Sequence, residues 1–278
     1  MNLEPLYLLN HTEDPVDLLQ KVKYNPEKDI TPLFTLSELE RVQQIWDAPQ
    51  GPASKGWTSG TIGWLEDTTN GIQYGRTEYA KFLAVAMGKS DFNKMLQSHF
   101  TAAVGCAVLT ADGFYLVQER APGLLASQRL DSSAAGMGVI VEGKLDLEEQ
   151  IKEKLKRELN LDNPVVIPTG IHGAADFVSS QFTWKCQIEQ SFEELKAKAN
   201  SKFIQRVHAV HQDDLVQFIL DHYKPEINDP QESLIADAVG VFLRAMPREH
   251  REITLERLDR QGAPIQYAVV REGRAELV

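Results

Sequence analysis

The first hundred residues alternate short predicted elements with loops. Apolar side chains recur at helical spacing from Leu36 to Trp46, and Thr35 or Ser37 is placed to cap this predicted helix. A short strand is predicted at Ile72 to Tyr74, with Thr77 as the cap of a helix from Glu78 to Met87. These elements predict a small α/β extension over residues 1–98.

From about residue 100 the pattern becomes β-rich. Ala102 to Thr110 is an almost continuous apolar run, Asp112-Gly113 favours a tight turn, and Phe114 to Arg120 alternates like a returning strand. The pattern therefore predicts a β-hairpin. Later strands are predicted at Val165 to Ile171, Phe182 to Ile188 and Phe203 to Val210.

A charged segment between these strands is the most informative part of the chain. Ile151, Leu155 and Leu159 recur every four residues, which predicts a helix with one apolar face against a sheet. Asn160 suits a left-handed helix end, and Pro164 prevents continuation. The order of strands and helices predicts an α+β protein, an α/β/α sandwich around a mixed sheet.

Two further predictions complete the organisation of the chain. A helix is expected from about Pro230 to Met246, and strands are expected from Ile253 onward, around turns near Gly262 and Gly273. We therefore predict an extension over residues 1–98, a main domain over residues 99–248 and a C-terminal β tail over residues 249–278.

Composition narrows the class of protein. With 278 residues and 42% hydrophobic residues, the chain can bury a sizeable core. Its net charge of −11 argues against nucleic acid or an anionic membrane as the main partner, because those surfaces attract basic proteins. Cys106 and Cys186 lie in apolar, strand-like contexts without metal-ligand spacing, which predicts reduced thiols in a cytoplasmic protein.

Several of these segments together resemble the Nudix superfamily. They are the hairpin Val104 to Arg120, the loop Ser133 to Gly136, the helix ending Glu158-Leu159-Asn160-Leu161 and the strand Pro164 to Ile171. The family signature is Gx5Ex7REUxEExGU, where U is apolar, and the resemblance covers about Phe100 to His222. It implies glutamates that hold Mg²⁺ against a diphosphate and activate water for hydrolysis.

The region before the hairpin is similar to the UDP-sugar diphosphatase branch of that family. The segment Thr77-Glu78-Tyr79-Ala80-Lys81-Phe82-Leu83 carries the Thr/Ser-x-Tyr-x-x-Phe-Leu pattern of its N-terminal extension. This resemblance implies a small-molecule ligand, a nucleotide diphosphate or a nucleotide sugar such as UDP-glucose.

The apolar face of the helix fixes one alignment of the signature, onto Glu153 to Leu161. Lys154 and Arg157 then occupy glutamate positions, and only Glu158 remains as metal ligand and catalytic residue. Glu142 is the nearest candidate for the loop glutamate. The resemblance thus implies Mg²⁺ held by Glu158 and Glu142, in a degenerate site where the cations lower the affinity for the metal.

A second alignment satisfies more letters of the signature. Gly143, Glu149, Arg157 and Glu158 fit its first part, and Asp162 then falls where the last glutamate belongs. Glu158 and Asp162 would be metal ligands four residues apart on one helical face. This alignment places Pro164 at the glycine of the signature and Leu161 at a ligand position, and it needs a longer loop after Ser133 to Gly136.

Two classes of function follow from the first alignment. Lys154, Arg157 and Arg120, together with Ser133 in the loop, are candidates for binding the ligand's phosphate directly, with or without hydrolysis. The alternative is a catalytically inactive Nudix module that senses a ligand or binds another protein. A helix face that only contacts water explains the same charges. The sequence does not indicate the oligomeric state.

Overall fold

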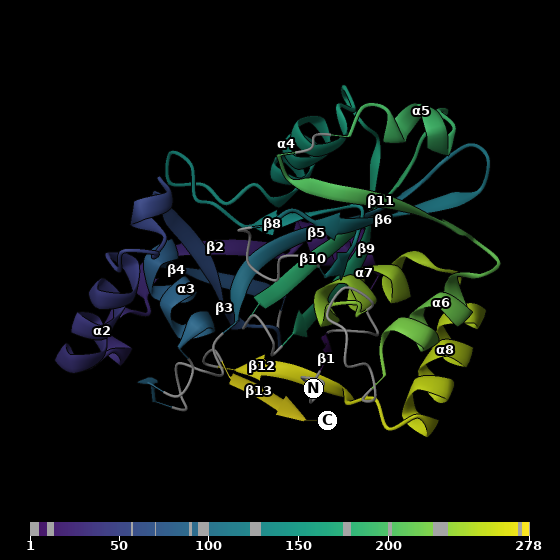
Figure 1. Cartoon of the computed structure of the whole chain (residues 1–278). Helices are drawn as coiled ribbons and strands as arrows, with labels where there is room; N and C mark the ends of the chain where they lie inside the picture. The colour runs from purple at the N-terminus through teal and green to yellow at the C-terminus, as the bar shows by residue number, and fades with distance from the viewer. Residues whose placement is uncertain are drawn as a thin grey trace.

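The computed structural model describes residues 6–9, 14–56, 58–69, 71–88, 91–93, 100–122, 129–174, 179–199, 202–224, 233–271 and 274–277. The strands join one mixed sheet, in the order β13-β12-β1-β9-β10-β5-β3-β4-β2, with β6, β7, β8 and β11 attached beside that path. Figure 1 shows helices α4 and α5 above this sheet and α6, α7 and α8 at its other side.

The N-terminal elements continue the main sheet. They are β1 (Leu6–Leu9), α1 (Pro15–Gln20), β2 (Val22–Asp29), the 3-10 helices Thr31–Leu33 and Ala53–Lys55, α2 (Leu36–Trp46), β3 (Thr61–Asp67), β4 (Ile72–Glu78) and α3 (Tyr79–Met87). Strand β3 meets β5 where Trp64 pairs with Thr101. The extension therefore shares its sheet with the hairpin that follows.

Two predicted helix starts in the extension have different outcomes. Thr35 caps α2 as predicted, in a capping box with Glu38. The predicted cap at Thr77 is wrong, because β4 continues to Glu78 in register with β3 and leaves Thr77 buried in the strand. Helix α3 then begins at Tyr79 and ends at Met87, before Gly88.

The remaining elements run from the hairpin to the end of the chain. They are β5 (Thr101–Leu109), β6 (Phe114–Arg120), β7 (Leu130–Asp131), β8 (Ala134–Met137), α4 (Leu147–Leu159), β9 (Val166–Ala174), β10 (Ser179–Gln187), α5 (Phe192–Lys196), β11 (Ile204–His211), α6 (Leu215–His222), α7 (Ala236–Ala245), α8 (Arg248–Arg260), β12 (Ile265–Arg271) and β13 (Arg274–Leu277). The predicted hairpin is confirmed, with Leu109 opposite Tyr115.

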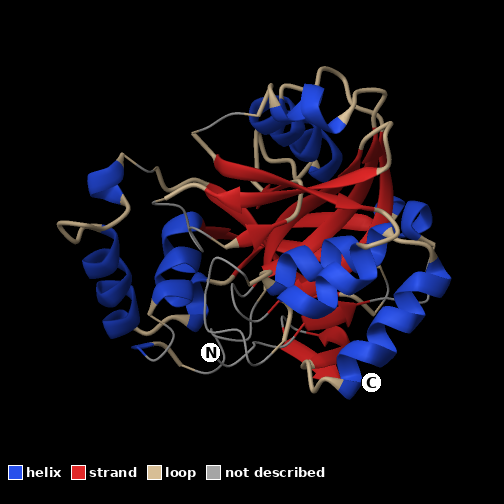
Figure 2. Ribbon diagram, turned by 45° about the vertical axis from the view of Figure 1, so that its right-hand side comes forward, coloured by secondary structure: helices blue, strands red, loops and turns tan. Residues whose placement is uncertain are grey.

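Strand β5 explains why helices cover both faces of the sheet. It is buried along its whole length. Its residues Val104 and Val108 pack in the cluster that contains the leucines of α4, whereas Ala107 and Leu109 pack in the cluster built on α6 and α7. Because successive strand side chains alternate between faces, one helical layer lies on each side, as Figure 2 shows. This confirms the predicted α+β sandwich.

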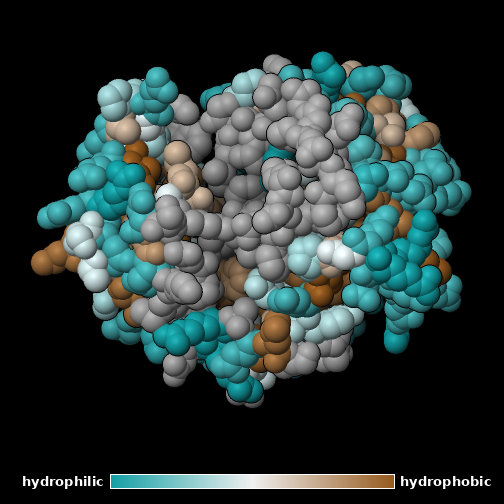
Figure 3. All heavy atoms as spheres, turned by 60° about the horizontal axis from the view of Figure 1, so that its bottom comes forward, coloured by the Kyte–Doolittle hydropathy of each residue, from teal (hydrophilic) through white to brown (hydrophobic). Residues whose placement is uncertain are grey.

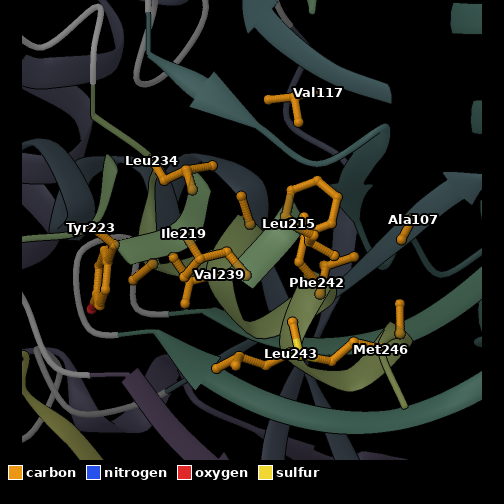
Figure 4. Close-up of a cluster of buried hydrophobic side chains, with 14 of the residues drawn as sticks. Ala107, Val117, Leu215, Ile219, Tyr223, Leu234, Val239, Phe242, Leu243 and Met246 are labelled. Carbon is orange, nitrogen blue, oxygen red and sulfur yellow. The ribbon is translucent and has the colours of Figure 1, made fainter. Parts of the chain in front are cut away.

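The α6 and α7 side of the core is almost wholly aliphatic and aromatic. Ile219 of α6 and Val239 and Phe242 of α7 point toward one another in Figure 4 and are fully buried. Tyr115 of β6 meets Phe242 edge to face, with ring centroids 6.1 Å apart. Helix α7 is thereby fixed against the sheet along its length.

The C-terminal region corrects two predictions. Helix α7 begins at Ala236, because Leu234 pairs with Leu130 of β7 as an isolated bridge; residues 230–232 lie outside the described part. The strand expected at Ile253 is wrong, since Arg248–Arg260 forms α8, with Thr254 and Leu258 buried one turn apart. The closing hairpin β12–β13 is confirmed, although its turn at 272–273 is not described.

Both cysteines are buried and free, as predicted. Within the described part of the chain, no helix is long and apolar enough to cross a membrane. Figure 3 shows one face of the molecule, where hydrophilic residues predominate and hydrophobic ones form small scattered groups among the coloured atoms.

Candidate functional site

Helix α4 presents a charged face to a pocket beside the sheet. Its apolar face is buried as predicted at Ile151, Leu155 and Leu159. Asn160 ends the helix in the left-handed conformation, with φ 54°, and Leu161 behind it is buried. This geometry agrees with the first alignment, in which Asn160 stands at the signature's glycine.

The second alignment finds less support in the position of its carboxylates. The helix ends at Leu159, so Asp162 does not continue the helical face of Glu158. Asp162 is instead exposed and lies 3.2 Å from the ammonium of Lys156, whereas Glu158 is buried. Glu149 is also exposed, in the first turn of the helix.

Lys154 and Glu158 lie one turn apart on the charged face of α4. Lys154 is half-buried and packs against Gly136 of β8, where an added Cβ would collide with the lysine side chain. The absence of a side chain at Gly136 therefore provides the space that the lysine occupies. Burial, together with the neighbouring Arg157, lowers the pKa of Lys154 to about 8, and Glu158 opposes this shift.

The buried carboxylate of Glu158 is held by cations. Arg157 donates to Glu158 Oε1 from Nη2 at 2.8 Å, and its guanidinium lies over the ring of Phe203, 4.6 Å from the centroid. Burial raises the pKa of Glu158, while Lys154 and Arg157 oppose that shift. Lys154, Arg157 and Glu158 thus form one charge cluster with two cations and one carboxyl group.

This cluster lines a pocket of about 180 Å³, which we name the α4 pocket. The other walls come from α3, β6 and β8 and from the residue before β11: Tyr79, Gln118, Arg120, Ala135, Gly136, Met137 and Phe203. The predicted residues Arg120, Lys154, Arg157 and Glu158 are therefore brought together. Gln118 is buried, and its Oε1 has no hydrogen-bond partner among the described residues.

A second, smaller pocket of about 90 Å³ shares the wall from Tyr79, Arg120 and Ala135 to Met137. We name it the α7 pocket, because Asp237 at the start of α7 lines it, together with Asp131, Ser179 and Gln181. Arg120 lines both pockets. Its Nη1 donates to Asp131 Oδ2 at 2.6 Å, and Asp131 has no exposed surface.

Asp237 is the centre of a buried polar group in the α7 pocket. Ser179 Oγ lies 2.8 Å and 2.9 Å from its two carboxylate oxygens, and His172 Nε2 lies 3.6 Å from Oδ1. Burial raises the pKa of Asp237, and burial also lowers the pKa of His172 to about 3, so this histidine is neutral at pH 7.

Asp131, Ser179 and Asp237 are pocket residues that no sequence motif indicated. One signal was present for Asp237, since it is the only charged residue from Leu234 to Leu243. An ionisable residue in an otherwise buried helix needs partners, which makes it a candidate for a site. Asp131 and Ser179 gave no comparable signal, because their proximity depends on the pairing of distant strands.

Ser133 and Glu142 lie apart from the pockets. Ser133 has no exposed surface, and its hydroxyl lies 2.6 Å from the carbonyl oxygen of Leu116 and accepts from the Val108 N–H at 2.8 Å. It lines neither pocket, and its hydroxyl connects strands β5 and β6. Glu142 is exposed in a turn between Val141 and Lys144, with φ 49°.

The residues around Glu158 do not form the oxygen-rich ligand set that Mg²⁺ takes. Mg²⁺ is held by carboxylates and water in octahedral geometry, whereas Glu158 is paired with Arg157 and has Lys154 beside it. No group of three or more potential ligands from His, Cys, Asp and Glu occurs among the described residues. The structure therefore gives Glu158 cationic partners at the position where the resemblance implies a metal.

Comparisons with known proteins locate similar structures but no family profile. No family model matches the chain, and no curated protein matches it. A crystal structure of a protein from Deinococcus radiodurans is 17% identical, with a TM-score of 0.34, over 42% of this chain and 71% of that one.

Two further structures carry the Nudix name. A MutT/Nudix family protein from Listeria innocua is 11% identical, with a TM-score of 0.33, over 42% of this chain and 81% of that one. A Nudix hydrolase from Nitrosomonas europaea is 19% identical, with a TM-score of 0.28, over 41% and 74%. These scores are too low to argue function, so the site must be interpreted from its own geometry.

Proposed function

We propose that this Nudix-like protein binds the phosphate groups of a nucleotide diphosphate or nucleotide sugar in the α4 pocket. The observation that carries the proposal is the position of Lys154. Its ammonium is held against Gly136 on the helix face where the resemblance implies a metal ion. In this proposal the lysine contacts the phosphate directly.

The charges around the α4 pocket support an anionic ligand. Lys154, Arg157 and Arg120 contribute three cations, and Glu158 is the carboxylate among the residues that line it. Arginine donates in a planar fork that matches phosphate oxygens, and a lysine acts as a point charge beside it. Phosphate binding in this pocket needs no metal.

The α7 pocket supports a ligand with a polar group next to its phosphate. Ser179, Asp131 and Asp237 offer hydroxyl and carboxyl groups close to Arg120, which lines both pockets. Sugar hydroxyls and the N–H groups of a base are complementary to such acceptors. A nucleotide sugar contains both kinds of group within one molecule.

Calorimetry with UDP-glucose tests the proposal. Wild-type protein should bind it equally well with Mg²⁺ and with EDTA, and Lys154→Met should weaken binding at least about tenfold, the effect of losing one charge-assisted contact. Lys156→Met is the matched control, since Lys156 is exposed on the same helix and pairs with Asp162. It should bind like wild type.

Two outcomes contradict the proposal. One is the absence of binding in both buffers, and the other is binding only with Mg²⁺. Phosphate release measured in the same samples tests separately whether the protein is a hydrolase. Release that requires both Mg²⁺ and Glu158 would indicate that the α4 pocket is the active site of a hydrolase.

A further inference from the structure

A cavity of about 370 Å³ lies between α7, α8, β1 and β12. Three arginines line it: Arg244 at the end of α7, and Arg248 and Arg251 at the start of α8. Leu8, Glu252 and Tyr267 contribute to the remaining wall. None of these residues lines the α4 or α7 pocket, so this arginine cavity is a separate site.

The side chain of Arg244 is buried and is held by hydrogen bonds to the backbone of two strands. It is 8% exposed, and its Nη2 donates at 2.8 Å to the carbonyl oxygens of both Leu9 and Ile171. Its Nε is buried and has no hydrogen-bond partner among the described residues. Gly170, with φ 135°, lies against this side chain, and a Cβ there would come within 3.1 Å of Arg244 Cδ.

The arginine cavity holds more positive than negative charge. Arg248 Nε lies 2.7 Å from Glu252 Oε1. Within the described ranges, neither Arg244 nor Arg251 has a carboxylate within ion-pair distance. Burial and repulsion by Arg251 lower the pKa of Arg244 to about 10, so its guanidinium stays charged at neutral pH.

The N-terminus of α8 adds to this imbalance. Arg248 and Arg251 lie among the first four residues of the 13-residue helix, whose N-terminus has no side-chain cap. The positive end of a helix dipole favours anions and disfavours cations. Glu249 in the same turn offsets part of this unfavourable charge, and an anion bound by Arg248 and Arg251 would offset more of it.

We propose that the arginine cavity binds the oxyanion group, phosphate or carboxylate, of a small molecule. Arg244 contributes a guanidinium held in place by two backbone carbonyls, and Arg248 and Arg251 add two more guanidinium groups to the lining. Its volume lies in the range of small-molecule sites, about 300–1,000 Å³. Leu8 and Tyr267 provide contact surface for the rest of such a molecule.

Calorimetry with inorganic pyrophosphate and, separately, with succinate tests this site. The experiment uses the Lys154→Met background, in which binding in the α4 pocket is weakened, so that the further effect of a change at Arg251 reports on the arginine cavity. Arg251→Gln should weaken binding of the preferred anion at least about tenfold. Arg251 has no ion-pair partner among the described residues, so this substitution leaves the described ion pairs intact.

Arg257→Gln is the control, because Arg257 lies on the same helix and donates to Gln217 outside the cavity. It should leave the affinity unchanged. Pyrophosphate binding identifies a phosphate ligand and succinate binding a carboxylate ligand. The proposal is overturned if neither anion binds, or if Arg251→Gln binds as tightly as its parent; neither result affects UDP-glucose binding by wild type.

Discussion

The α4 pocket and the arginine cavity both contain three cations, but more of the cations in the α4 pocket are paired with carboxylates of the protein. In the α4 pocket, Arg157 is paired with the buried Glu158, and Arg120 is paired with the buried Asp131. In the arginine cavity, Arg248 forms an ion pair with the exposed Glu252, and among the described residues Arg244 and Arg251 form none. One site is largely neutralised by the protein, and the other is not.

This difference in neutralisation affects how selectively each site would bind a ligand. A largely neutralised site gains little from charge alone and depends on geometry, because two of its three cations already have carboxylate acceptors. A site with excess positive charge attracts any small oxyanion and discriminates weakly. We therefore expect the α4 pocket to be the more selective of the two.

The largest effect should come from removing the packing behind the α4 pocket. Leu155 is fully buried between α4 and the sheet, so Leu155→Ala should lower the free energy of unfolding by about 2–5 kcal/mol, measured by urea denaturation. Leu36→Ala is the control, since Leu36 is 82% exposed and its loss should change stability by less than about 0.5 kcal/mol.

Folded Leu155→Ala protein should retain anion binding in the arginine cavity, whose walls do not include α4. Equal loss of binding at both sites would show that the α4 pocket and the arginine cavity do not form independently of each other.

A change at Glu158 tests whether the α4 pocket is neutralised from within. Glu158→Gln removes the carboxylate beside Lys154 and Arg157, so affinity for UDP-glucose should rise by about tenfold, or ~1.4 kcal/mol. The exposed Glu153 on the same helix gives the control, Glu153→Gln, which should have little effect. Weaker binding in Glu158→Gln, measured by calorimetry, would mean that the carboxylate itself contacts the ligand.

A smaller, graded difference should appear with pH. Lys154 has a pKa of about 8, so its charge is lost between pH 7 and 9, and UDP-glucose affinity should fall over that range by up to about tenfold. Sulfate, whose charge is constant there, should bind the arginine cavity equally at both pH values, because Arg244 titrates near 10. Lys154→Met should abolish the pH dependence of UDP-glucose binding.

The same pKa shift predicts the sign of a stability change. Lys154 releases its proton at lower pH in the folded state than its ordinary value of 10.5, so the unfolded chain binds more protons between pH 8 and 10.5. This group's contribution to the free energy of unfolding therefore rises with pH over that window and is constant in Lys154→Met. A fall with pH attributable to Lys154 would contradict the shift.

The sequence predicted the elements whose signals are local. The apolar period of α4, the turn before β6 and the cap at Thr35 each depend on a few adjacent residues, and each is found in the structure. The strand misassigned at Ile253 had an equally local but ambiguous signal. Its β-branched residues Ile253 and Thr254 favour a strand, whereas ion pairs four residues apart, such as Arg248 with Glu252, favour the observed helix.

The candidate site was predicted only in part, for a related reason. Lys154, Arg157 and Glu158 share one helix, so helical geometry alone placed them together. Asp131, Ser179 and Asp237 come from β7, β10 and α7, and only long-range pairing brings them to one pocket. Ser133 shows the converse, because its position next to the signature suggested a ligand contact whereas its hydroxyl lies within the sheet.

The position of β1 has a consequence for how the chain folds. Strand β1 lies between β9 and β12, antiparallel to the first and parallel to the second. Its two neighbours follow it more than 150 and 250 residues later in the sequence. Such distant pairing slows folding, and the edge of β1 that pairs with β12 stays unpaired until β12 has been synthesised. This part of the sheet should therefore form late, in the step that pairs β1 with β12.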